Sequence, residues 1–151
     1  MLIVYINELA LKGIYTHVIE YADKEAIGKL IGTPYYHRSS HCKFIDIQNH
    51  VPVNSISTAQ SVEYSFEAFE ILGKDLLINH EKEMVVGWYH SHPNLGCFLS
   101  KRDIRTQKEN YTEWYHCALV IDHFSNEMEF FNINEFGEVQ KLEYYIYRKR
   151  R

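Results

Sequence analysis

The chain has 151 residues, 46% of them hydrophobic, which suits one domain with a sizeable core and excludes a disordered, collagen-like or multidomain protein. Sixteen basic residues against twenty acidic ones give a net charge of -4, and this balance excludes a general nucleic-acid binder. No run approaches the roughly 18 to 20 apolar residues of a membrane span, and no signal peptide is evident, so we expect a soluble, cytoplasmic protein without a membrane partner.

The N-terminal half predicts a strand, a helix and two further strands. Residues 2–6 form a short apolar strand, and Asn7 then offers a side-chain oxygen that caps a helix. The buried stripe of this helix has helical spacing and comprises Leu11, Ile14, Tyr15, Val18 and Tyr21. Strands are predicted over 25–36 and 44–53. Gly28 and Gly32 in the first of these indicate the close approach of another backbone or a ligand.

The C-terminal half is organised around a central strand. A second helix is predicted to begin at Ser65, with apolar residues at helical spacing as far as Leu77. The continuous apolar run 85–89 is typical of a strand that is covered on both faces. A helix over 100–113 and strands over 116–122, 127–133 and 139–147 follow. We expect residues 1–147 to form a single domain and the basic residues 148–151 to form a solvated tail.

Two histidines follow the predicted central strand. His90 and His92 are two residues apart, and because side chains alternate across a strand, both imidazoles project to the same face. One divalent ion could therefore accept both. The pair alone is a weak signal, since nine histidines occur in the chain and two neighbouring surface histidines are the alternative interpretation.

The residues after the histidines strengthen the metal interpretation. Pro93 ends the strand, Gly96 permits a turn and Ser100 begins a helix, so the chain can fold back toward the imidazoles. Asp103 would then be the third ligand. Two imidazoles and one carboxylate suit zinc, and three protein ligands leave a fourth position open, which is typical of a catalytic rather than a structural zinc ion.

Ser100 and Asp103 have a second interpretation, because SxxD is also a capping box in which the acid reaches back to its own helix terminus. A carboxylate turned toward a metal cannot, on this reasoning, also cap its helix. We therefore expect the two roles of Asp103 to exclude each other. Ser100 can remain at the N-cap position while its hydroxyl points into the site.

The sequence HSHP, then NLGCFL, then SKRD resembles the JAMM motif of the MPN-domain metalloproteases, which is HxHP, six further residues and SxxD. Upstream, EAIGKLIG over 25–32 is similar to the ExxGxLxG strand of that family, whose glutamate faces the metal. The stretch 87–107 is especially similar to deubiquitinating members of the proteasome lid and signalosome type. The resemblance covers roughly residues 2–122. No long insertion is evident after Asp103 in this sequence, whereas larger deubiquitinases use inserted segments to hold ubiquitin.

The resemblance implies an α/β fold, the MPN (JAB) domain, with a cytidine-deaminase-like central mixed sheet flanked by helices. It further implies one catalytic Zn²⁺ held by His90, His92 and Asp103, with Glu25 as the general base and Ser100 as the donor to the oxyanion. Cys97 lies between these ligands and is expected to be an oxidisable thiol, not a nucleophile. The three cysteines, with no CxxC pair, suit a reducing compartment.

The activity that the resemblance implies is zinc-dependent hydrolysis of the bond between the C-terminus of ubiquitin, or a ubiquitin-like protein, and a target lysine. The expected partners are the modifier and its conjugates, and an oligomer or larger complex fits as well. One alternative is a processing peptidase that trims a ubiquitin-like or sulfur-carrier precursor. A non-catalytic MPN scaffold subunit is an alternative of another class. The last is a protein with a capping box and surface histidines only, which would bind no zinc.

Overall fold

A computed structural model of the protein describes residues 1–53 and 83–149. The helix predicted from Ser65 lies outside these residues. The elements in chain order are β1 (Leu2–Asn7), α1 (Glu8–Glu20), β2 (Ile27–His37), β3 (Cys42–Val53), β4 (Met84–Ser91), α3 (Lys101–Asn110), β5 (Cys117–Asp122), β6 (Glu127–Ile133), β7 (Val139–Leu142) and β8 (Tyr144–Tyr147).

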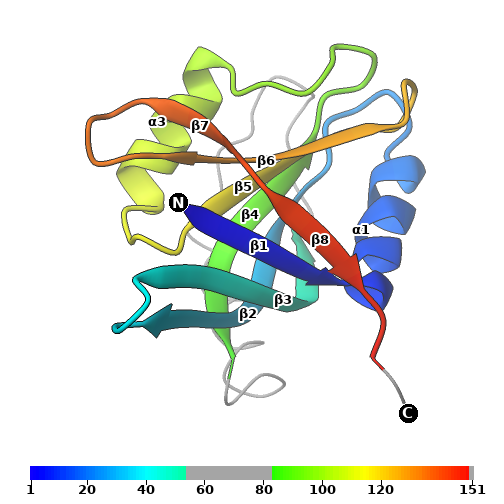
Figure 1. Ribbon diagram of the computed structural model, residues 1–151. Coiled ribbons are helices and arrows are strands. Elements are labelled where there is room, and N and C mark those ends of the chain that lie inside the picture. Colours follow the sequence, from blue (N-terminus) through cyan, green and yellow to red (C-terminus); the bar gives the residue numbers. More distant parts are fainter. Residues whose placement is uncertain (54–82, 150–151) are drawn as a thin grey trace.

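The strands form one mixed, eight-stranded sheet in the order β7-β6-β5-β4-β2-β3-β1-β8 (Figure 1). The pairs β1–β3, β1–β8 and β4–β5 are parallel, and the other pairs are antiparallel. The predicted central mixed sheet is therefore confirmed, as is the central place of β4. The strand β4, which contains the apolar run 85–89, has a neighbouring strand at each edge and a buried core on each face.

The prediction of one strand over 139–147 was wrong. Glu143 divides this segment into β7 and β8, which lie at opposite ends of the sheet order. In Figure 1 the two strands run in succession across the curled sheet, from beside β6 to beside β1. The Glu143 carbonyl accepts a hydrogen bond from the Val4 N–H at 3.0 Å. Sheet twist brings the two end strands near each other, so a single residue is enough to pass between them.

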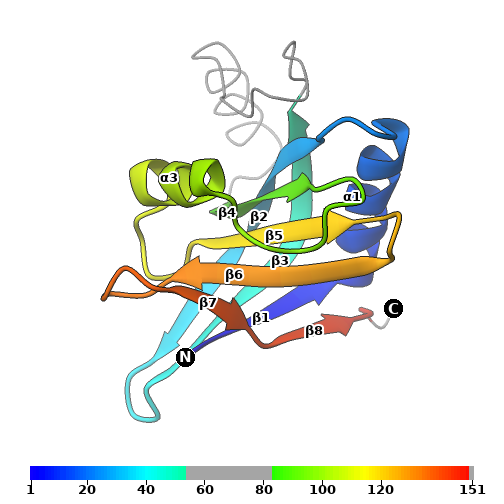
Figure 2. The same ribbon diagram turned by 90° about the horizontal axis from the view of Figure 1, so that it is seen from above.

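A buried core lies on each face of the sheet, because successive strand residues alternate between the faces. On one face Tyr89 of β4 and Leu119 of β5 belong to the core cluster that includes the apolar residues of α1. On the other face Trp88 and Val120 pack with residues that flank α3. Figure 2 shows α1 and α3 at opposite sides of the sheet. His90 follows Trp88 by two positions and therefore faces α3.

Two glycines of β2 lie where a side chain would collide: at Gly32 the neighbour is a backbone, as predicted, whereas at Gly28 it is a side-chain ring. A Cβ at Gly28 would come within 2.2 Å of the Tyr89 ring, and one at Gly32 would come within 1.9 Å of the Asp46 carbonyl oxygen. The first contact packs the Tyr89 ring directly over β2, and the second lets β3 approach closely. The absence of a side chain at these two positions therefore allows β2 to pack closely against its neighbours.

The two described helices begin at the predicted caps. Asn7 accepts a hydrogen bond from the Leu9 N–H at 2.8 Å, and Ser100 is the N-cap of α3. Helix α3 ends at Asn110, three residues before the predicted Glu113. Neither of these helices has the length and apolar character that crossing a membrane requires.

Candidate metal centre

The two histidines of the HSHP sequence are buried at the C-terminal end of β4. His90 is 0% exposed and His92 is 3% exposed. The alternation of the strand sends both imidazoles to the α3 face, while Ser91 between them faces the opposite way. The interpretation as surface histidines is therefore wrong.

The first turn of α3 brings Asp103 to the histidines. Nε2 of His90, Nε2 of His92 and Oδ2 of Asp103 are each 3.0 Å from the other two atoms. The loop between β4 and α3 reverses the chain with left-handed residues at Asn94, with φ of 59°, and at Gly96, with φ of 81°. Glycine has no steric penalty at such φ values, and asparagine tolerates them better than most residues. Among the described residues, these three side chains form a group that could hold a metal ion.

The donor set fits a zinc ion. Ligands about 2.0–2.2 Å from one tetrahedral zinc ion lie about 3.3 Å from one another, close to the 3.0 Å separations of these atoms. One carboxylate and two imidazole nitrogens are also ligands that zinc prefers. Their burial adds to the fit, because a bound cation would offset the cost of keeping the Asp103 carboxylate away from water.

The structure corrects the expectation that the two roles of Asp103 exclude each other. The Ser100 hydroxyl accepts a hydrogen bond from the Asp103 N–H at 3.1 Å, and Asp103 Oδ2 accepts one from the Ser100 N–H at 2.9 Å, so the capping box is complete. The same Oδ2 atom faces both histidines. A carboxylate oxygen accepts more than one partner, and the helix terminus lies close enough to the imidazoles for it to serve both.

Hydrogen bonding keeps Asp103 ionised despite its burial. Burial by itself raises the pKa of this carboxyl, but the hydrogen bonds from His90 and His92, together with the Ser100 N–H, hold the pKa well below its usual range. The site therefore contains a fixed negative charge. This charge is what a bound cation would neutralise.

Glu25 and Ser100 line one cavity beside Asp103. The cavity has a volume of about 270 Å³ and is completed by Lys101 and Arg102. Glu25 was predicted to begin a strand over 25–36, but β2 begins at Ile27, so Glu25 precedes the strand. Its carboxyl is half-buried, and burial raises its pKa although the nearby histidines oppose the shift. The structure thus brings together all five residues that the sequence singled out.

Ser91 is a residue that the sequence reasoning missed. Its hydroxyl accepts a hydrogen bond from the Ala26 N–H at 2.8 Å, and its own N–H donates to the Ala26 carbonyl at 3.0 Å. These two bonds attach the segment that carries Glu25 to the end of β4. The signal was present in the strand alternation, because the residue between two inward histidines must face the neighbouring chain on the other side.

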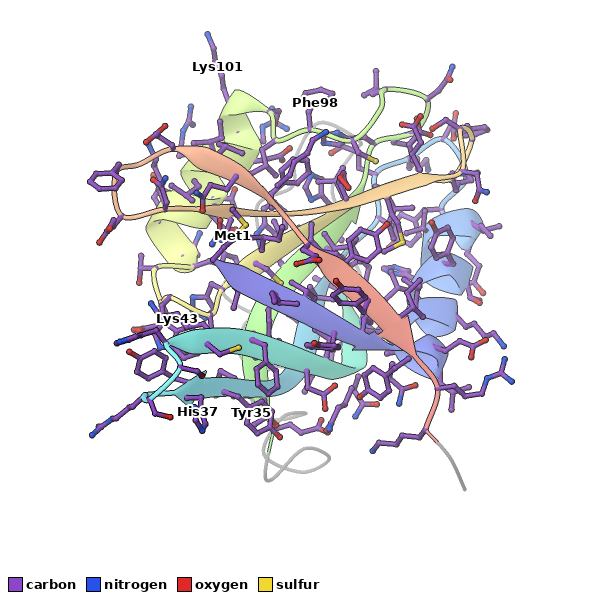
Figure 3. All side chains as sticks on the ribbon, in the orientation of Figure 1. Met1, Tyr35, His37, Lys43, Phe98 and Lys101 are labelled. Atoms are coloured by element: carbon purple, nitrogen blue, oxygen red, sulfur yellow. The ribbon has the colours of Figure 1, made fainter. Side chains whose placement is uncertain are left out.

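Aromatic rings enclose the histidines from two directions. Trp88 is fully buried in the core, and it stacks on His90. Phe98 is 47% exposed, and its ring centroid is 4.8 Å from that of His92. Figure 3 shows Phe98 beside Lys101 at the outer edge of the molecule, at the opposite end from Tyr35 and His37. Phe98 is thus a solvent-facing apolar side chain next to the site.

Cys97 lies in the same loop but is not activated. Its thiol donates a weak hydrogen bond to the Val120 carbonyl, with an S···O distance of 3.4 Å. Burial raises the pKa of this thiol, so the thiolate is scarce at neutral pH. This supports the expectation that Cys97 is not a nucleophile.

Known proteins are similar to this chain in fold or in sequence. Protein DSY2949 from Desulfitobacterium hafniense, a solution structure, superposes with a TM-score of 0.71 over 97% of this chain and 94% of that chain, at 19% identity. COP9 signalosome complex subunit 5 from Kluyveromyces lactis is 31% identical over 78% of this chain, and ubiquitin carboxyl-terminal hydrolase RPN11 from Saccharomyces cerevisiae is 35% identical over 70%. The chain spans only 30% and 33% of the lengths of these two relatives.

A family model covers the region that contains every residue of the site. The model described as JAB1/Mov34/MPN/PAD-1 ubiquitin protease matches residues 1–113, from β1 to just beyond α3. The matched region carries the buried histidine pair, the aspartate of α3 and the glutamate before β2. Because this family model matches three quarters of its length, the chain belongs to the JAB/MPN family.

Proposed function

We propose that the protein is a zinc-dependent isopeptidase, which hydrolyses the bond between the C-terminus of ubiquitin, or a ubiquitin-like protein, and a target lysine. One observation carries this proposal: three buried donor atoms converge beside a cavity that contains a carboxylate and a hydroxyl. The family description and the name of the RPN11 relative, a ubiquitin carboxyl-terminal hydrolase, support the substrate class.

The proposed ligands of one catalytic zinc ion are His90, His92 and Asp103. When bound, zinc supplies a Lewis acid and makes water acidic enough to attack a carbonyl at neutral pH. The protein holds the ligands without rearrangement, because β4 orients both imidazoles and the capping box orients the carboxylate. Three protein ligands leave room for substrate or water.

Glu25 is proposed as the general base. Its carboxylate takes a proton from the attacking water as the new C–O bond forms, and returns that proton to the lysine amine as the C–N bond breaks. The half-buried position suits this role, since burial raises the pKa of Glu25 and makes the carboxylate a better proton acceptor. The two Ser91 hydrogen bonds to Ala26 hold this segment in place.

Ser100 is proposed to stabilise the oxyanion. Its oxygen accepts from the Asp103 N–H, which leaves the hydroxyl hydrogen to donate toward the cavity that it shares with Glu25. An amide hydrolysis develops negative charge on the carbonyl oxygen, and one such donor contributes about 2.7–4 kcal/mol of transition-state stabilisation.

The scaffold alternative is less well supported, because all five chemical positions are present and converge. The name of the COP9 signalosome relative records that this relative is a subunit of a complex. We propose that this chain likewise acts together with a partner subunit.

The activity is tested with the zinc-loaded protein, a lysine-linked ubiquitin conjugate and a precursor with residues beyond the terminal glycine, each with and without a chelator. Intact mass measures the products. We expect cleavage of the conjugate that the chelator abolishes. Cleavage of the precursor alone would establish the processing peptidase instead, and one equivalent of bound zinc without any cleavage of these substrates would favour the scaffold.

Three substitutions test the assigned roles. Glu25→Ala should retain zinc and the fold while losing turnover, and Glu109→Ala on the exposed face of α3 is its control. Asp103→Asn should lower the zinc content in elemental analysis. Ser100→Gly should reduce kcat by about 10²–10³-fold, while the loss of the cap itself costs only a few tenths of a kcal/mol. A Glu25→Ala protein that still cleaves at the normal rate would remove Glu25 from the mechanism.

A further inference from the structure

The loop between β4 and α3 is held by Asp122, a residue outside the family motif. Asp122 is the last residue of β5 and is 1% exposed. Its Oδ1 accepts from the Asn94 N–H and its Oδ2 from the Gly96 N–H, both at 3.0 Å. Oδ1 also accepts from the N–H groups of Phe124 and Ser125. One buried carboxylate therefore holds two peptides of the loop from the neighbouring strand.

The Asp122 carboxylate is charged in the folded protein. Burial by itself raises its pKa, but the N–H groups of Gly96 and Asn94 outweigh this effect and lower the pKa to about 2. A charged acceptor makes stronger hydrogen bonds to these N–H groups than a neutral one. The attachment of the loop is therefore strong at neutral pH.

The Gly96 peptide reaches the metal centre on its other side. Its carbonyl oxygen is 3.3 Å from Nδ1 of His92. A carbonyl only accepts, so this contact requires a proton on Nδ1 of His92, and in a neutral imidazole Nε2 is then the nitrogen that can bind a metal. A further bond, from the His92 N–H to the Ile121 carbonyl at 2.8 Å, fixes the backbone of His92 to β5.

The two histidines are oriented in different ways. Nδ1 of His90 has no hydrogen-bond partner among the described residues, and its ring is held by stacking on Trp88. Stacking sets the plane of a ring but does not choose between its two tautomers. Of these two histidines, His92 alone has a hydrogen-bond partner for Nδ1 among the described residues.

We propose that Asp122 is a positioning residue for His92: it fixes the Gly96 peptide, whose carbonyl accepts from Nδ1–H of the imidazole and so directs Nε2 to the metal. The role of zinc in this proposal rests on the proposed function. The contacts of Asp122, Gly96 and His92 do not depend on that function, because they are observed between residues of this chain. Partners of metal-binding histidines typically change metal affinity by about 10–100-fold when they are removed.

Asp122→Asn is the sharpest test. The amide oxygen can keep the contacts of Oδ1, whereas the amide nitrogen then faces the Gly96 N–H, so the link to Gly96 is lost. Glu135→Gln, at an exposed turn, removes the same charge elsewhere and is the matched control. Long-range ¹H–¹⁵N spectra of the histidine rings in the zinc-loaded proteins report which nitrogen of His92 carries the proton. Competition with a chelator measures zinc affinity.

We expect Nδ1 of His92 to carry the proton in the zinc-loaded wild-type protein, and we expect zinc affinity to be lowered about 10–100-fold in Asp122→Asn and unchanged in the control. A proton on Nε2 of His92 in the zinc-loaded wild-type protein would overturn the proposal even if the variant did not fold. So would an unchanged zinc affinity in a folded Asp122→Asn protein. Zinc binding without isopeptidase activity would instead contradict the proposed function alone.

Discussion

The indole of Trp88 lies flat against the imidazole of His90, with ring centroids 4.4 Å apart and an angle of 10° between the planes. The indole is itself fixed, because its Nε1–H donates to Oε1 of Gln107 at 2.7 Å. Gln107 is 2% exposed, and its amide nitrogen donates to the His116 carbonyl at 3.2 Å. A side chain of α3 thereby supports a histidine of β4 through the tryptophan between them.

Gln107→Leu should therefore destabilise the protein by about 1–3 kcal/mol, because it leaves the buried indole N–H without its acceptor. In a Trp88→Phe background the same change should cost less, since no indole N–H remains to be left unpaired. Chemical denaturation of the four proteins in this cycle measures the coupling. Strictly additive free energies of unfolding would show that the Trp88–Gln107 hydrogen bond contributes nothing beyond packing.

Ser91→Ala should reduce kcat while zinc content stays at the wild-type level. The substitution removes the acceptor of the Ala26 N–H and loosens the segment that carries Glu25, but it leaves the three proposed metal ligands unchanged. Elemental analysis and steady-state kinetics of the proposed isopeptidase reaction separate the two effects. Ser39→Ala, in the exposed turn between β2 and β3, is the control. Loss of zinc in step with activity would show that Ser91 supports the metal centre as a whole.

Lys29 should make the stability of the protein rise with pH between about pH 7 and 10.5. Its side chain is 2% exposed, and burial lowers its pKa from 10.5 to about 7. In that window the unfolded chain binds the lysine proton and the folded chain does not, so the free energy of unfolding increases with pH, by at most about 1.4 kcal/mol per pH unit from this group.

The Lys29 contribution is isolated by comparing the wild-type protein with Lys29→Met over this pH range. The free energy of unfolding of the wild-type protein should rise relative to that of Lys29→Met as the pH increases, because methionine carries no proton. Lys141→Met, at an exposed position of β7, should show no such trend. Parallel pH profiles for Lys29→Met and the wild-type protein would mean that Lys29 keeps its charge when folded.

The three cysteines should react with iodoacetamide in the order of their exposure. Cys42 is exposed, Cys97 is half-buried with a raised pKa, and Cys117 is fully buried with a pKa far above its usual range. Only the thiolate reacts, so burial slows alkylation through both access and ionisation. Mass spectrometry of digests taken over time should find Cys42 modified first and Cys117 only after unfolding. Early modification of Cys97 would show that the β4–α3 loop opens in solution.

Local patterns accounted for much of the fold. The Asn7 and Ser100 caps, the stripe of α1 and the apolar run of β4 are properties of neighbouring residues, so periodicity and capping chemistry predicted them. Glu143 illustrates the opposite case. Nothing around it differs from an ordinary strand residue, and its position as a break depends on where the curled sheet places β6 and β1. No local pattern contains that information.

The sequence by itself determined which residues are candidates for the site, because the spacing of His90, His92 and Asp103 and the family resemblance of the segment at Glu25 select them before any fold is known. The tertiary structure decided how those groups are held: that one oxygen of Asp103 both caps α3 and faces the imidazoles, that Ser91 anchors the glutamate segment, and that Asp122 reaches the loop from the adjacent strand. The physical reason is that these contacts join residues up to 65 positions apart, and their hydrogen bonds exist only when two strands and a helix terminus meet.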